Sequence, residues 1–159
     1  MDNNVSFRVH KDELADAAAW VARSLPTKST QPVLRAVVIT ADDNGLEFAG
    51  FDYEVSTRVR IAAEVNDPGR VAVAGKLLAD IVGTMPNDAI EVSTDGKVMT
   101  LRARSSRFEL PLIALDDYPQ LPQLPEVTGR ISPAALTGAV TQVASAAGRD
   151  DTLPMLTGI

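Results

Sequence analysis

The chain has 159 residues, of which 45% are hydrophobic and 23% are charged, with 10 glycines, 10 prolines and no cysteine. This composition is ordinary for a globular protein and excludes a disordered tail, a collagen-like repeat and a disulfide-stapled miniprotein. The 15 basic and 21 acidic residues give a net charge of −6, and with a single histidine and no cysteine the chain has no His–His metal motif, catalytic thiol or cysteine zinc site.

The amino-terminal part changes from a strand pattern to a helix pattern. Val5, Phe7 and Val9 alternate with polar residues, which predicts a strand. Residues 11–25 carry apolar side chains three and four positions apart, which predicts an amphipathic helix that ends before Pro26. The polar start and the absence of a run of about 18 apolar residues favour a cytoplasmic protein without a membrane segment.

The middle of the chain is typical of short strands separated by turns, with one further helix. The helix is expected at 75–84, and Asp95-Gly96 is a hairpin signal. Strands are expected at 32–40, 46–50, 53–62, 70–74, 89–93, 98–103 and 107–112.

A proline-rich segment follows these strands. Residues 114–126 contain three prolines and predict an extended linker between a first domain, 1–113, and the start of a second domain, 127–159. In the second domain we expect a strand at 127–131 and a helix at 133–147, with Ser132 as its N-cap.

The second domain repeats the beginning of the first. Without a gap, the following residues recur 122 positions later: Val5, Arg8, Leu14, Ala17, Val21, Ala22, Thr30, Pro32 and Leu34. A fainter repeat of 64 residues brings Leu14-Ala15-Asp16 onto Leu78-Ala79-Asp80 and indicates two similar halves within the first domain. The chain is therefore interpreted as a fragment of a longer repeat protein.

Several segments, in order, resemble one known family. They are Phe7-Arg8-Val9, Leu14-Ala15-Asp16-Ala17, Gly50-Phe51-Asp52-Tyr53-Glu54-Val55, Gly75-Lys76-Leu77-Leu78-Ala79-Asp80-Ile81, Ser106-Arg107-Phe108-Glu109-Leu110-Pro111, Asp117-Tyr118-Pro119 and Gly148-Arg149-Asp150. With them, essentially the whole chain resembles the amino-terminal part of the bacterial DNA polymerase III beta subunit, the DNA sliding clamp, in an actinobacterial form.

The resemblance implies an α+β clamp fold. Each domain would consist of two strand–helix–strands halves, with the helices on the DNA side and antiparallel sheets outside. Two three-domain subunits would close into a homodimeric ring around duplex DNA and tether the replicative polymerase. Such a protein is a non-catalytic processivity factor without a cofactor or metal. An acidic net charge suits this role, because tight phosphate contacts would slow sliding.

The resemblance also implies where the chain meets its partners. In the family, Lys28 and Arg149 lie at or beside DNA-contacting loops, and the candidate DNA contacts on or next to the predicted helices are Lys28, Arg149, Arg23, Lys76 and Lys11. The strand at 107–112 would form the dimer edge, with apolar contacts from Phe108 and Leu110 and with Arg104 and Arg107 facing acidic partners. Leu156 would belong to the groove that binds polymerase, clamp loader and repair factors.

Two alternatives remain. A truncated or phage-type clamp mimic would act as a protein-binding module without forming a ring. A hydrolase using a carboxylate pair is disfavoured, because the sequence lacks an arrangement of nucleophile and base. Gly69 to Lys76 is not a phosphate loop, since Leu77 stands where Ser or Thr is required.

Overall fold

The computed structural model describes residues 4–28, 31–150 and 152–159. It divides into two compact units, with the boundary between Pro122 and Gln123. None of the helices in these ranges is long and apolar enough to cross a membrane.

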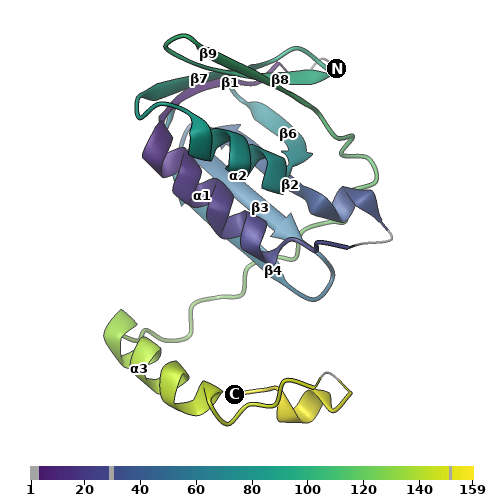
Figure 1. Ribbon diagram of the computed structural model, residues 1–159, viewed down its shortest axis with the longest axis vertical. Helices are drawn as coiled ribbons and strands as arrows, with labels where there is room; N and C mark the ends of the chain where they lie inside the picture. Colours follow the sequence, from purple (N-terminus) through teal and green to yellow (C-terminus); the bar gives the residue numbers. More distant parts are fainter. Residues whose placement is uncertain (1–3, 29–30, 151) are drawn as a thin grey trace. The chain divides into compact units, whose positions relative to one another are not determined.

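The first unit is an α+β domain of two antiparallel sheets and two α-helices (Figure 1). Its elements are, in chain order, β1 (Ser6–His10), α1 (Lys11–Ser24), the 3-10 helix η1 (Pro32–Arg35), β2 (Ala36–Asp42), β3 (Gly45–Phe51), β4 (Ser56–Ile61), β5 (Glu64–Asp67), β6 (Gly69–Ala74), α2 (Gly75–Thr84), β7 (Ala89–Thr94), β8 (Val98–Ala103) and β9 (Ser106–Pro111). Sheet A has the strand order β5-β1-β7-β8-β9, and sheet B has the order β4-β3-β2-β6. The predicted class is confirmed.

The two halves of this domain exchange their first strands. β1 pairs with β7 of the second half, and β6 pairs with β2 of the first half. α1 begins at Lys11 and α2 at Gly75, which is the 64-residue spacing seen in the sequence. After β4 the chain crosses to pair β5 with β1, and after β9 Leu112 forms a bridge with Val73 of β6. The domain therefore has an internal pseudo-two-fold relation in which β4 corresponds to β9.

The core lies between the two helices and one face of each sheet. α1 and α2 lie side by side and pack their apolar faces against it (Figure 1). Gly75 starts α2 against the end of α1, where an added Cβ would overlap Leu25 Cδ1. The largest fully buried side chains include Phe7, Leu14, Ile39, Phe48, Leu78 and Leu101.

A smaller core covers the other face of sheet B. Ala36, Val38 and Ala72 point to this face because side chains alternate along a strand, and Tyr118 packs on them. The backbone N–H of Ile113 donates to the carbonyl oxygen of Ala72 at 2.8 Å. We call residues 113–122 the strap. The strap packs as part of the first unit, whereas the predicted division at 113 and 126 stays a proposal.

The second unit contains α3 (Pro133–Ala144) and the 3-10 helix η2 (Pro154–Leu156). Ser132 is the N-cap of α3, as predicted, and its Oγ accepts from the Ala135 N–H at 3.2 Å. α3 and η2 begin 122 residues after α1 and η1, respectively. None of the described residues of α3 is buried, in contrast to α1.

Four local predictions need correction. Residues 32–35 form a 3-10 helix where a strand was predicted, since Pro32 lacks the N–H that a strand ladder uses. β4 begins only at Ser56, because Asp52 Oδ1 accepts from the N–H groups of Glu54 and Val55 and turns the chain there. Residues 127–131 form no strand, because no described neighbour pairs with them. The last predicted helix ends at Ala144. The short strand β5 was not predicted at all.

Candidate functional site

The ends of the two helices bring two of the predicted cations together. Arg23 lies in the last turn of α1 and Lys76 in the first turn of α2, and the close packing at Gly75 makes these turns neighbours. Both side chains are exposed. They line one shallow pocket, the α1–α2 groove, together with Ala19, Ala22, Leu25, Thr27, Ala79 and Asp80.

Arg23 also lines a second hollow on the other side of α1. This hollow, which we call the Trp20 hollow, is formed by Glu13, Asp16, Ala17, Trp20, Arg23, Val59 and Ile61. The Arg23 guanidinium carbon lies 5.7 Å from the centroid of the Trp20 ring, within the range of a cation–π contact. Trp20 is 53% exposed although it is the largest apolar side chain of the helix. The exposed surface of α1 therefore carries an aromatic ring in contact with a guanidinium.

The other predicted DNA-contacting cations differ in their exposure and in whether they form an ion pair. Lys11 is half-buried, its Nζ lies 3.8 Å from Asp12 Oδ1, and its backbone N–H donates to the Asp88 carbonyl oxygen. Lys28 is exposed in the loop after α1, and Arg149 is exposed in the second unit after α3. Within the described ranges, no carboxylate lies at ion-pair distance from Arg23, Lys28, Lys76 or Arg149.

The predicted dimer strand, β9, is the edge of sheet A. Phe108 and Leu110 share one face, as predicted, but that face points into the domain. Leu110 is fully buried and Phe108 is half-buried against the same core. The assignment of Phe108 and Leu110 to a subunit contact stays a prediction, and within this chain Leu110 is already covered by its own domain.

The two arginines predicted for this edge already have partners within the chain. Arg104 Nε donates to Asp88 Oδ2 at 2.8 Å, and Arg104 itself has a positive φ of 52° in the β8–β9 turn. Arg107 Nη2 donates to Glu109 Oε1 at 2.5 Å on its own strand. The hydrogen bond from Arg104, followed by that from the Ala89 N–H, holds the pKa of Asp88 below its usual value. Both arginines remain exposed at the sheet edge.

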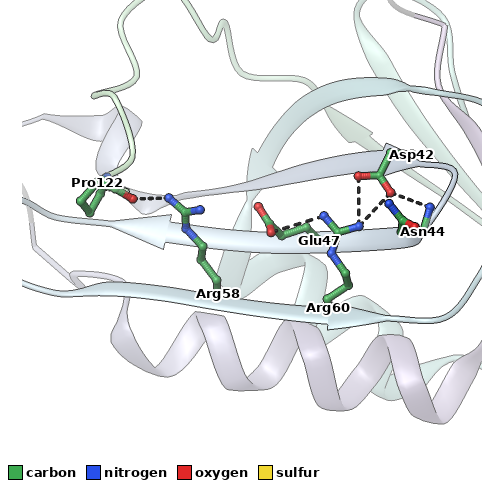
Figure 2. Close-up of polar contacts among 6 residues, drawn as sticks. All are labelled: Asp42, Asn44, Glu47, Arg58, Arg60 and Pro122. Carbon is green, nitrogen blue, oxygen red and sulfur yellow. Dashed lines mark hydrogen bonds and ion pairs between the residues drawn. The ribbon is translucent and has the colours of Figure 1, made fainter. Parts of the chain in front are cut away.

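Sequence reasoning missed a pair of arginines on β4, at the edge of sheet B (Figure 2). Arg60 Nη1 donates to Asp42 Oδ1 at 2.8 Å, and its Nη2 reaches Glu47 Oε2 at 3.5 Å. The Arg60 hydrogen bond is the main cause of a lowered pKa at Asp42. Arg58 donates to the carbonyl oxygen of Pro122 at the end of the strap. Glu47 and Arg60 stand opposite each other in the β3–β4 register, so opposite charges in a predicted hairpin were the available signal.

The predicted groove residue Leu156 lies in η2, where 57% of its surface is exposed. Its carbonyl oxygen accepts from the Gly148 N–H at 2.6 Å, which closes the loop after α3. Over the described part of the chain, no group of three His, Asp or Glu side chains is placed to hold a metal ion.

Comparison with known proteins gives consistent matches. The family model for the DNA polymerase III beta subunit, N-terminal domain, matches residues 5–122. The chain is 49% identical over 155 residues to the beta sliding clamp of Streptomyces coelicolor, covering 98% of this chain and 41% of that protein. It is 44% identical to the beta sliding clamp of Micrococcus luteus, covering 98% of this chain and 50% of that protein. The crystal structure of the Bacillus subtilis sliding clamp matches 98% of this chain and 43% of that one, with 25% identity and a TM-score of 0.89. The chain thus spans half or less of these relatives.

Proposed function

The chain belongs to the DNA polymerase III beta subunit family, and on this premise we propose that it forms the amino-terminal part of a beta sliding clamp. The complete protein would be a non-catalytic processivity factor: a homodimeric ring that encircles duplex DNA without sequence preference. A ring keeps the polymerase at a high effective concentration near the primer end without tight contacts of its own. In this proposal residues 1–113 are the first clamp domain, 114–126 connect it, and 127–159 begin the second.

The observation that carries the proposal is the repetition of elements along the chain. α1 and η1 recur as α3 and η2 after the same interval of 122 residues, and each is preceded by matching residues. A ring built from similar domains requires this kind of repetition, and a single-domain binding module does not.

The helices supply the DNA side in this proposal. Arg23, Lys76 and Lys28 would contact phosphates from the first domain, and Arg149 from the second. Lys11, already paired with Asp12, would contribute least. This small set of proposed phosphate contacts agrees with a net charge of −6 and with a protein that slides.

Subunit contact would use the open edge of β9. The backbone of this edge, with Arg104, Arg107 and the exposed part of Phe108, would pair with a strand of the other subunit. Leu156 would join a groove for polymerase, clamp loader and repair factors. As a replication factor, the protein would act in the bacterial cytoplasm.

A chimera tests the function. Residues 1–159 replace the matching segment of the Streptomyces coelicolor clamp, and primer extension is measured on circular and linear templates with clamp loader and polymerase. We expect processive synthesis on the circular template, because a closed ring cannot slide off it.

A control separates failure of the ring from failure of folding. The chimera is first checked for a folded dimer by sedimentation. A folded dimer that gives no processivity on circular DNA would contradict the proposed function. A folded monomer would favour the binding module.

A further inference from the structure

We propose that Trp20 is a positioning residue that keeps Arg23 available to a DNA phosphate at the α1–α2 groove, where Lys76 provides a second cation. The inference rests on the proposed function and specifies how one part of its DNA-facing surface works. Two observations support it: the Arg23 guanidinium lies over the Trp20 ring, and among the described residues it forms no ion pair.

Arg23 has carboxylates within its own surroundings. Glu13 and Asp16 line the Trp20 hollow together with Arg23. An exposed guanidinium beside two carboxylates commonly forms an ion pair, because the attraction costs little desolvation at the surface. Among the described residues, however, Arg23 has no ion-pair partner, and its guanidinium lies over the Trp20 ring.

The ring contact differs from an ion pair in what it leaves free. A guanidinium stacked on an aromatic face keeps its in-plane N–H donors and its full charge for another partner. When a guanidinium is paired with a carboxylate, most of its N–H donors are occupied and its charge is largely neutralised. The Trp20 contact also restricts the Arg23 side chain, so less conformational entropy is lost when an anion binds.

The phosphates of the DNA backbone fit the resulting arrangement. Arg23 and Lys76 stand on the same groove, whose lining also includes the hydroxyl group of Thr27 and the single carboxylate of Asp80. Neither cation is paired within the described part of the chain, whereas Lys11, Arg60, Arg104 and Arg107 are. Two unpaired cations on one groove would each contact one of two neighbouring phosphates of the same DNA backbone.

The test measures how the affinity of the 159-residue chain for a fluorescently labelled DNA duplex of mixed sequence depends on salt. Arg23→Gln and Lys76→Gln should each lower the slope of log affinity against log salt by about one, because each removes one phosphate contact. Lys97→Gln removes an exposed cation in the β7–β8 turn and should leave the slope unchanged.

Substitutions of Trp20 test the positioning role. Trp20→Ala should lower the slope as much as Arg23→Gln does, and the double variant Trp20→Ala/Arg23→Gln should lose nothing more. Trp20→Phe, which retains a ring face, should keep most of the slope. The triple variant Trp20→Ala/Glu13→Gln/Asp16→Asn should have a steeper salt slope than Trp20→Ala. This gain should exceed the one that Glu13→Gln/Asp16→Asn gives in a chain that retains Trp20. Urea unfolding of each variant confirms that the fold is intact.

The outcomes separate this inference from the proposed function. If Lys28→Gln lowers the salt slope but Arg23→Gln and Lys76→Gln do not, the chain does contact DNA and this inference fails. If Trp20→Ala changes nothing while Arg23→Gln does, or if the acidic substitutions give no rescue, Trp20 has no positioning role. If the wild-type chain does not bind the duplex at all, the inference fails, and the processivity of the chimera decides the function separately.

Discussion

Arg104 and Asp88 form an exposed ion pair with a measurable electrostatic signature. The Arg104 hydrogen bond is the main cause of the lowered pKa of Asp88. A carboxyl group whose pKa is lower in the folded than in the unfolded state stabilises the fold at neutral pH, and this contribution disappears as the pH falls through the folded-state pKa. Arg104→Gln should therefore raise the pKa of Asp88 toward its ordinary value, and the unfolding midpoints of variant and wild type should converge in acid.

A carbon-13 NMR titration of the Asp88 carboxyl group measures this shift. Asp42, which is held by Arg60, serves as the internal control and should titrate identically in both proteins. An unchanged pKa at Asp88 in the variant would show that the pair does not persist in solution.

Tyr118 gives the opposite dependence at alkaline pH. Burial raises the pKa of its hydroxyl group above the ordinary value of 10.0. Above about pH 10 the unfolded chain releases this proton while the folded chain retains it, so the free energy of unfolding should fall as the pH rises. Tyr118→Phe should lessen this fall in urea unfolding experiments between neutral and alkaline pH. The exposed Tyr53 provides the matched control, and a decline in Tyr118→Phe as steep as in the wild type would contradict the assignment.

At the scale of elements, two glycines of α2 should respond oppositely to the same substitution. An added Cβ at Gly75 would overlap Leu25 Cδ1, whereas nothing lies within 4 Å of one at Gly83. Gly75→Ala should lower the free energy of unfolding by about 1–3 kcal/mol through overpacking. Gly83→Ala should raise it by up to about 1 kcal/mol through helix propensity. Urea unfolding measures both, and a neutral Gly75→Ala would show that the ends of the helices are not tightly packed.

The elements that sequence reasoning found are those with a strong local pattern. α1 and α2 have an apolar stripe, and β8 has strict alternation, so their bounds were predicted closely. β5 was missed because only Val65 in it is even partly buried and its partner β1 is far away in sequence. Residues 127–131 have a strand pattern, but a strand also requires a neighbour, which no local pattern supplies.

Local sequence pattern also predicted only part of the candidate site. Arg23 and Lys76 were identified as cations, but their shared groove depends on how α1 and α2 pack, which lies outside either helix's own sequence. Alternation shows that Phe108 and Leu110 share a face without showing that this face lies against the core of the same chain, so the burial of Leu110 could not be read from the sequence.

At the scale of the whole molecule, the strap decides where the first unit ends. A chain ending at Pro122 should unfold with the same midpoint as the first unit of the full chain, because the unit boundary falls there. A chain ending at Ile113 loses Tyr118 and its packing on sheet B and should be less stable by about 3 kcal/mol. Urea unfolding of the two shortened chains compares them. Equal midpoints would show that the strap adds no stability and that the domain ends at residue 113.

The exchange of first strands has a consequence for synthesis on the ribosome. Ser6 of β1 faces Ser93 of β7 in sheet A, and β2 completes sheet B only with β6. The amino-terminal half therefore leaves the ribosome before β6 and β7 exist to complete its sheets, and closing such long loops slows folding. Neither half can reach its native form during its own translation. The complete domain can form only after the strands of the second half have emerged.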